Sequence, residues 1–196
     1  MSTAMNEPPT TATRAAFSTF AESTAEDWAI ITPQLDVTQS FVPARVVELL
    51  RVMGTDHGGF PVSRLEHSLQ TATRAERDGR DDEYVFCALV HDIGDTLSPL
   101  NHPEVAAAIV RPFVSPANHW LVEHHGVFQG YYFWHHIGLD RDAREQFRNS
   151  PYFGHTEEFC AEYDQVAFDA SYRSQPLEHF EPLVHVMLTK AGADGS

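Results

Sequence analysis

The chain has 196 residues, of which 42% are hydrophobic, a length typical of one domain that buries roughly two thirds of its unfolded surface. Thirteen Lys and Arg against twenty-eight Asp and Glu give a net charge of −15. This charge disfavours binding to nucleic acid, whose phosphates are recognised by clustered cations, and to an anionic membrane. The sequence also contains twelve His, and because histidine is the commonest metal ligand, we expect a metal site.

The first residues do not resemble an export signal. They lack the basic start and the apolar run of a signal peptide, and no apolar stretch approaches the ~20 residues of a membrane span. Cys87 and Cys160 are the two cysteines, too few for a disulfide framework, and we expect both to be small buried hydrophobic residues. These features predict a cytoplasmic protein.

Residues 1–40 are predicted to be an N-terminal tail and arm. Residues 1–13 are rich in Ser, Thr, Ala and Pro and are expected to be disordered, whereas residues 14–40 carry scattered apolar groups that predict a short helix within an arm. This arm could be a lid, a packing strap or a partner-binding tail. Residues 41–190 are predicted to form the folded domain, and residues 191–196 a C-terminal tail.

From residue 41 onward, helix-capping residues alternate with apolar positions at helical spacing. Pro43 begins a predicted helix that Gly54 ends, and Ser63 begins the next one with a capping box. Another runs from Ser115 to His125, where Gly126 is expected to stop it. The remaining predicted helices begin at Asp81 or Asp82, at Asn101, at Asp140 (to about Arg148), at His155 (to Ala167) and at Pro176 (to Lys190). The pattern predicts an all-α globule of roughly seven to nine helices.

Two residues that can bind metal, His91 and Asp92, follow directly after the apolar stretch of residues 87–90. Gly94 is then expected to end the helix. A buried imidazole and a buried carboxylate need partners, and one divalent metal ion would satisfy both side chains. Taken alone, the His-Asp pair is a weak signal and favours a structural hydrogen-bonded pair over a metal site.

His67 lies one predicted helix earlier than this pair, and Asp164 lies in a late amphipathic helix. This order of ligands, together with the string Ala-Leu-Val-His-Asp-Ile-Gly at residues 88–94, resembles the HD-domain superfamily of helical metalloenzymes over about residues 43–188. The resemblance implies an HD-domain helical globule with a metal core of His67, His91, Asp92 and Asp164.

Two further histidines, His102 and His125, make the chain similar to one branch of that superfamily. This branch contains the mixed-valent diiron oxygenases, namely myo-inositol oxygenase and the oxygenases that cleave hydroxy-phosphonates. The sequences of residues 61–72 and 102–107 resemble those of the first-ligand and third-ligand helices of the phosphonate-cleaving group. The resemblance implies two iron ions, Fe(II) and Fe(III), with Asp92 as the ligand that bridges them.

Either His124 or His125 could be the fourth histidine ligand. The family pattern places an apolar residue three positions before this ligand, so that Val122 selects His125 and Leu121 would select His124. We favour His125, because Gly126 is expected to end the helix and to leave the ring at the helix C-terminus. His124 is then expected to lie beside the ligands or to face the substrate.

The residues that would contact substrate depart from the phosphonate-cleaving group. Gln129 stands where that group has a Lys that holds the phosphonate. His57 and Phe60 stand where it has a Tyr and a Glu that cap the iron, and His57 could still cap a metal. An anionic head group would have to rely on arginines such as Arg64. The resemblance therefore leaves the substrate open, with phosphonates and amino-containing molecules as candidates.

The implied activity is the oxidation of a small hydroxylated molecule by O2, through abstraction of a hydrogen from carbon and cleavage of a C–C or C–P bond. The alternative is a metal-dependent phosphohydrolase that acts on a nucleotide or phosphoester with a single Mn, Mg or other divalent ion. Such an enzyme usually needs basic groups for phosphate, and these are scarce here because Lys190 is the only lysine. The sequence leaves the oligomeric state open.

Overall fold

The computed structural model describes residues 14–55 and 57–189, and in this part of the chain every regular element is helical. The all-α prediction is therefore confirmed. The predicted tails at residues 1–13 and 191–196 lie outside the described residues. Within the described ranges, no helix has both the length and the apolar character needed to cross a membrane. The chain divides into two compact units, residues 1–42 and 43–196.

The N-terminal unit contains a 3₁₀ turn, η1 (Phe20–Glu22), and the helix α1 (Ala25–Ser40). Thr24 begins α1 with a capping box, because its side chain accepts a hydrogen bond from the Asp27 amide while the Asp27 carboxylate accepts one from the Thr24 amide. This box satisfies two amide donors that helix ends leave without partners. The helix that begins here has 16 residues and is longer than the short helix predicted for this region.

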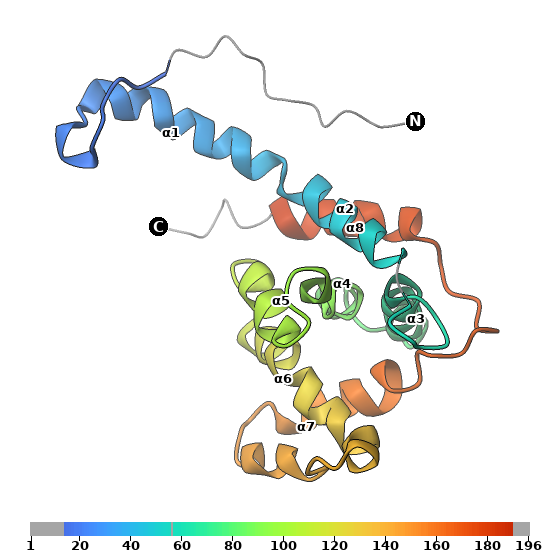
Figure 1. Cartoon of the computed structure of the whole chain (residues 1–196). Coiled ribbons are helices and arrows are strands. Elements are labelled where there is room, and N and C mark those ends of the chain that lie inside the picture. Colours follow the sequence, from blue (N-terminus) through green and yellow to red (C-terminus); the bar gives the residue numbers. More distant parts are fainter. Residues whose placement is uncertain (1–13, 56, 190–196) are drawn as a thin grey trace. The chain divides into compact units, whose positions relative to one another are not determined.

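The larger unit is built around α4, in which every residue from Tyr84 to Val90 is buried. Helices α3, α6 and α8 all pack against α4, and Figure 1 shows α3 beside it and α5 beside α6. This packing carries the residues that follow α4 into the protein interior. In chain order the elements are α2 (Val42–Met53), α3 (Arg64–Arg77), α4 (Asp82–Val90), η2 (Ile93–Thr96), α5 (His102–Val110), α6 (Pro116–Phe133), η3 (Trp134–Ile137), η4 (Ala143–Phe147), α7 (Phe153–Phe159), η5 (Cys160–Asp164) and α8 (Leu177–Thr189).

The prediction that a helix stops at Gly126 is wrong, because α6 continues to Phe133. Gly126 instead marks the close approach of α5 to α6. A Cβ atom at this position would lie 3.1 Å from Cγ of Pro103 in α5, a tight contact that the absence of a side chain avoids. A glycine inside a helix is tolerated at a cost of about 1 kcal/mol relative to alanine, so its presence alone does not end a helix.

Two predicted helices near the C-terminus take other forms. The segment predicted as a helix from Asp140 to about Arg148 forms only the 3₁₀ helix η4. The single helix predicted from His155 to Ala167 is an α-helix that changes at Cys160 into the π-helical turn η5. In η5 the wider i→i+5 bonding, seen in the Gln165 amide donating to the Cys160 carbonyl at 3.0 Å, turns Asp164 into the buried interior.

Candidate metal centre

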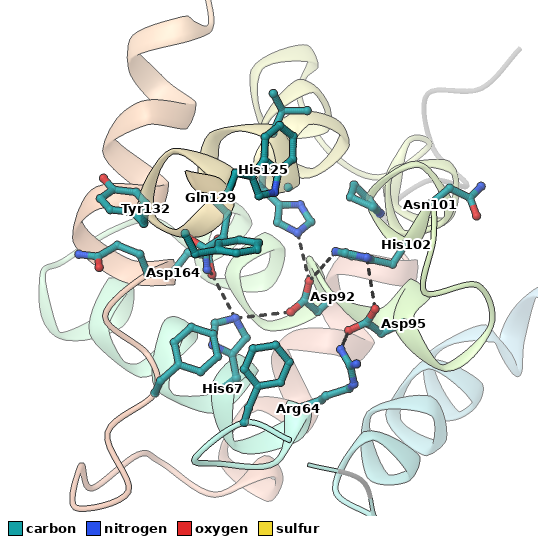
Figure 2. Close-up of a pocket in the computed structure, with 18 of the residues that line it drawn as sticks. Arg64, His67, Asp92, Asp95, Asn101, His102, His125, Gln129, Tyr132 and Asp164 are labelled. Atoms are coloured by element: carbon teal, nitrogen blue, oxygen red, sulfur yellow. Dashed lines mark hydrogen bonds and ion pairs between the residues drawn. The ribbon is translucent and has the colours of Figure 1, made fainter. Parts of the chain in front are cut away.

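Elements far apart in the sequence bring the six predicted ligands to one place, and Figure 2 labels all of them except His91. Helix α3 contributes one histidine, the end of α4 contributes the His-Asp pair, and α5, α6 and η5 contribute one residue each. In this order they are His67, His91, Asp92, His102, His125 and Asp164.

Three of these residues, His67, His91 and Asp164, form a buried group at the base of the site. The Nε2 atom of His67 lies 3.1 Å from Oδ1 of Asp164 and 3.2 Å from Nε2 of His91. The Nε2 atom of His91 lies 3.7 Å from the same carboxylate oxygen. The donor atoms of this trio are therefore close enough together to hold one metal ion, as are those of His91, Asp92 and His125.

The backbone fixes the tautomer of every predicted histidine ligand. The Nδ1 atom of each ring faces a carbonyl oxygen, which can only accept a hydrogen bond, so that Nδ1 carries the proton and the neutral ring presents its lone pair at Nε2. These contacts join His67 to Ala167 (3.1 Å), His91 to Ala88 (2.9 Å), His102 to Pro99 (3.1 Å) and His125 to Val122 (2.7 Å).

This arrangement fits a divalent cation. When both rings are neutral, the lone pairs on Nε2 of His67 and His91 face each other at 3.2 Å and repel, unless a proton or a metal ion lies between them. A positive charge relieves that conflict, and nitrogen and carboxylate donors of this kind suit Fe, Mn or Zn.

The two carboxylate oxygens of Asp92 lie close to two pairs of histidines, and three of these histidines, His67, His102 and His125, are labelled in Figure 2. Its Oδ2 atom lies 3.4 Å from Nε2 of both His67 and His91. Its Oδ1 atom lies 3.1 Å from Nε2 of His125 and 3.3 Å from Nε2 of His102. One carboxylate therefore faces two different sets of nitrogen donors.

The electrostatics of the site also favour a cation. Burial of Asp92 and Asp164 opposes ionisation, but the neighbouring histidines outweigh it and hold the pKa of both carboxyl groups well below the ordinary value. Burial opposes protonation of His91, but the charges of Asp92 and Asp164 raise its pKa to about 9. For His125 burial prevails and lowers the pKa. In the absence of metal, the site thus keeps its carboxylates charged and binds a proton at His91.

Asp95 is a buried residue of the site that the sequence pattern did not single out. Its Oδ1 atom lies 3.2 Å from Nδ1 of His102, and its carboxylate also forms an ion pair with Arg64. Asp95 therefore orients the ring of His102 and forms an ion pair with Arg64, the residue that we considered as a partner for an anionic substrate. The spacing of Asp92 and Asp95, one turn apart around η2, was the available signal for this role.

Of the two adjacent histidines of α6, only His125 reaches the ligand cluster. The His124 ring stacks on Trp120 with centroids 4.0 Å apart and meets Phe147 edge-on at 4.8 Å. Consecutive helical residues point about 100° apart, so one ring faces the site while the other packs among aromatic rings. His57 is exposed, and neither it nor His124 lines the cavity above the ligands.

Gln129 contacts a predicted ligand. Its Nε2 atom donates a hydrogen bond to Oδ1 of Asp164 at 2.9 Å, and Sγ of Cys160 lies 3.7 Å from the other oxygen of that carboxylate. These two side chains fix the orientation of Asp164. The second polar atom of Gln129, Oε1, is buried and has no hydrogen-bond partner within the described residues.

A cavity of about 580 Å³ opens above the ligands. On one side Phe168 stacks on His67 with centroids 4.4 Å apart, and Phe60 stacks on Phe168 at 5.5 Å. Other aromatic side chains of the lining come from the end of α6 and from Trp134. The volume falls within the range typical of small-molecule sites.

Part of the chain matches a known protein family. The model of the HD domain matches residues 64–170, a span that contains all six predicted ligands. A search of curated proteins found none that matches the chain.

Proposed function

Since the chain belongs to the HD domain family, whose members are typically metal-dependent enzymes, we propose that it is a diiron oxygenase. It uses O2 to oxidise a small hydroxylated molecule, with abstraction of a hydrogen from carbon and cleavage of a C–C or C–P bond. Its partners are the substrate and O2, with neither nucleic acid nor membrane involved.

The geometry of Asp92 is the observation that supports this proposal. Its two oxygens face the pair His67 and His91 on one side and the pair His102 and His125 on the other. One metal ion would need only the deeper donors, namely His67, His91, Asp92 and Asp164, whereas two metal ions would also be held by His102 and His125. Mixed nitrogen and oxygen donors with open positions suit iron.

Bound iron would supply Lewis acidity toward a substrate oxygen and one-electron chemistry toward O2. The protein supplies the geometry. Backbone carbonyls hold the four imidazole rings through Nδ1, while Gln129 and Cys160 hold Asp164. Phe168 covers one face of the His67 ring and so shields the base of the site from water.

A metal-dependent phosphohydrolase with one metal is the second candidate. It is favoured by the deeper donors alone, because His67, His91, Asp92 and Asp164 provide a complete set for one ion. The charge of the cavity argues against it. Among the described residues of the lining, Arg64 supplies the one guanidinium, and that group is paired with Asp95.

Iron stoichiometry and low-temperature EPR test the proposal. Protein purified anaerobically with iron and then partly oxidised is expected to hold two irons per chain and to show the half-integer signal of a coupled Fe(II)/Fe(III) pair. One metal per chain, no such signal, and phosphate release from nucleotides without O2 would instead support the phosphohydrolase.

Adjacent histidines provide matched variants for the second metal position. His125→Ala and His102→Ala are each expected to lower iron content to about one per chain, since each removes a donor near Oδ1 of Asp92. His124→Ala is the control, because its ring stacks on Trp120 instead, and it should keep both irons. If neither His102→Ala nor His125→Ala lowers iron content, the assignment of a second metal is wrong.

A further inference from the structure

The charges in the cavity bear on the chemistry of the substrate. Apart from the predicted ligands, the lining contains three carboxylates, those of Asp95, Glu104 and Glu123. The guanidinium of Arg64 faces Asp95 in an ion pair. A phosphate, phosphonate or carboxylate group reaching beyond the metal ions would therefore meet negative charge that the described lining does not offset, and a desolvated like-charge contact is unfavourable.

The apolar part of the lining is extensive and partly uncovered. Phe60, Leu100 and Phe133 line the cavity although they are 48%, 100% and 44% exposed. The lining also includes Val127 and Phe168. Exposed apolar side chains gathered around one cavity indicate a ligand that covers them, because each square ångström of apolar surface removed from water contributes about 25 cal/mol.

Gln129 adds a preference for a hydrogen-bond donor. It lines the cavity, and while its Nε2 atom is committed to Asp164, its Oε1 atom is buried with no partner in the described part of the chain. Buried acceptors are almost always paired. An ammonium or hydroxyl group could supply the missing donor, whereas an ionised phosphonate or carboxylate offers acceptors only.

From these three observations we propose that the substrate is a small alcohol with an apolar, ring-sized body and a neutral or cationic head group. The inference rests on the proposed function, since it concerns the substrate of the same metal centre. It excludes two substrate classes that the resemblance to diiron oxygenases suggests, namely hydroxy-phosphonates and polyols without an apolar face.

Four probes of similar size test the proposal on the full chain loaded with iron. They are 2-amino-1-phenylethanol, 1-phenyl-1,2-ethanediol, hydroxy(phenyl)methylphosphonate and myo-inositol, each titrated against the EPR signal of the Fe(II)/Fe(III) pair. The first two are expected to bind at least about tenfold more tightly than the last two, a difference of about 1.4 kcal/mol. Equal or tighter binding of the phosphonate or of inositol would overturn the proposal.

The two proposals can fail separately. If no mixed-valent signal forms, the proposed function fails, and the same four probes are then compared by calorimetry on the protein loaded with Mn²⁺. If the signal forms but the order of affinities is reversed, the diiron centre stands and the substrate class is wrong.

Two pairs of variants locate the effect in the cavity. Glu123→Lys is expected to reduce the ratio of the affinity for the amino alcohol to the affinity for the phosphonate by about tenfold. Glu178→Lys makes the same charge change on α8, outside the cavity lining, and is expected to leave this ratio unchanged. Phe60→Ser is expected to weaken both favoured phenyl probes about tenfold at unchanged iron content, and Phe20→Ser, another exposed aromatic, to leave them unaffected. Equal effects within either pair would overturn the proposal.

Discussion

The two sides of the Asp92 carboxylate differ in how the chain holds the histidines that face them. At the base, His67, His91 and Asp164 are at most 4% exposed, and they come from elements that pack around the protein core. At the rim, the side chain of His102 is 24% exposed. His102 is the first residue of α5, and Asp95 contacts its ring. Core packing thus fixes the base and also His125, which is 2% exposed, whereas a few polar contacts fix His102 at the rim. We expect the rim to lose its metal first.

Removing the shared carboxylate should have the largest effect, because it affects both sides at once. Asp92→Ala takes one oxygen from the base and one from the rim, and we expect the affinity for iron to fall by about 100-fold or more at each position. Metal analysis after dialysis measures this loss. Asp36→Ala, at an exposed position of α1, is the control. Full retention of one metal by Asp92→Ala would show that the base does not need this carboxylate.

Titration of the metal-free protein should separate His91 from His125. His91 has a pKa of about 9 when folded, against 6.5 as its ordinary value, so its stabilising contribution is complete below pH 6.5 and is lost as the pH rises through 9. The loss is on the order of 3 kcal/mol in the free energy of unfolding. His125 has a lowered pKa, so below pH 6.5 the unfolded chain binds the proton more tightly and stability falls as the pH decreases.

Urea unfolding between pH 5 and 9.5 measures both effects, and we expect the free energy of unfolding to reach a maximum near neutrality. The decline in stability toward pH 9 should disappear in the metal-loaded protein, because a metal ion bound by His91 would exclude the proton. It should also disappear in His91→Gln. A decline that persists in His91→Gln would assign it to another group.

Gly94 should be needed for the rim specifically. A Cβ atom at Gly94 would lie 2.3 Å from the carbonyl oxygen and 2.9 Å from Cα of His102, and because these are backbone atoms, the start of α5 would have to move. We expect Gly94→Ala to destabilise the protein by about 2–3 kcal/mol and to lose the second iron while the first remains.

The control for this variant is Gly154→Ala. Gly154 lies in α7 with no atom within 4 Å of the added Cβ, so the substitution should stabilise the helix by up to about 1 kcal/mol. Urea unfolding and iron analysis of both variants provide the comparison. Equal iron loss in the two variants would show that the contact with His102 is not responsible.

Asp95→Asn should have the smallest effect, one confined to the rim. The amide keeps the size of the side chain but removes the charge that faces His102 and Arg64. Loss of such an outer contact typically weakens metal binding by about 10–100-fold, so we expect the second iron to dissociate more readily at unchanged affinity for the first. Competition with a chelator measures the two affinities. Asp36→Asn is the matched control.

Local patterns predicted much of the structure correctly. Ser63 and Asp81 cap the helices expected of them, and the apolar residues before His91 are buried. The errors arose where distant residues intervene. Gly126 was expected to end a helix, but it packs against Pro103. The turn at Cys160 was expected to be α-helical, but π-helical bonding brings Asp164 to His67.

The sequence by itself determined that the chain is helical and which residue types could bind metal, because capping residues and apolar spacing act over one or two helical turns. The sequence favoured His125 over His124, but only the tertiary structure decided that the His124 ring packs against Trp120 and Phe147. It also decided that Asp95 forms an ion pair with Arg64 and that the two oxygens of Asp92 face different histidines. These features depend on contacts between side chains from separate helices. No spacing along the chain specifies such contacts, because they are set by how the helices pack.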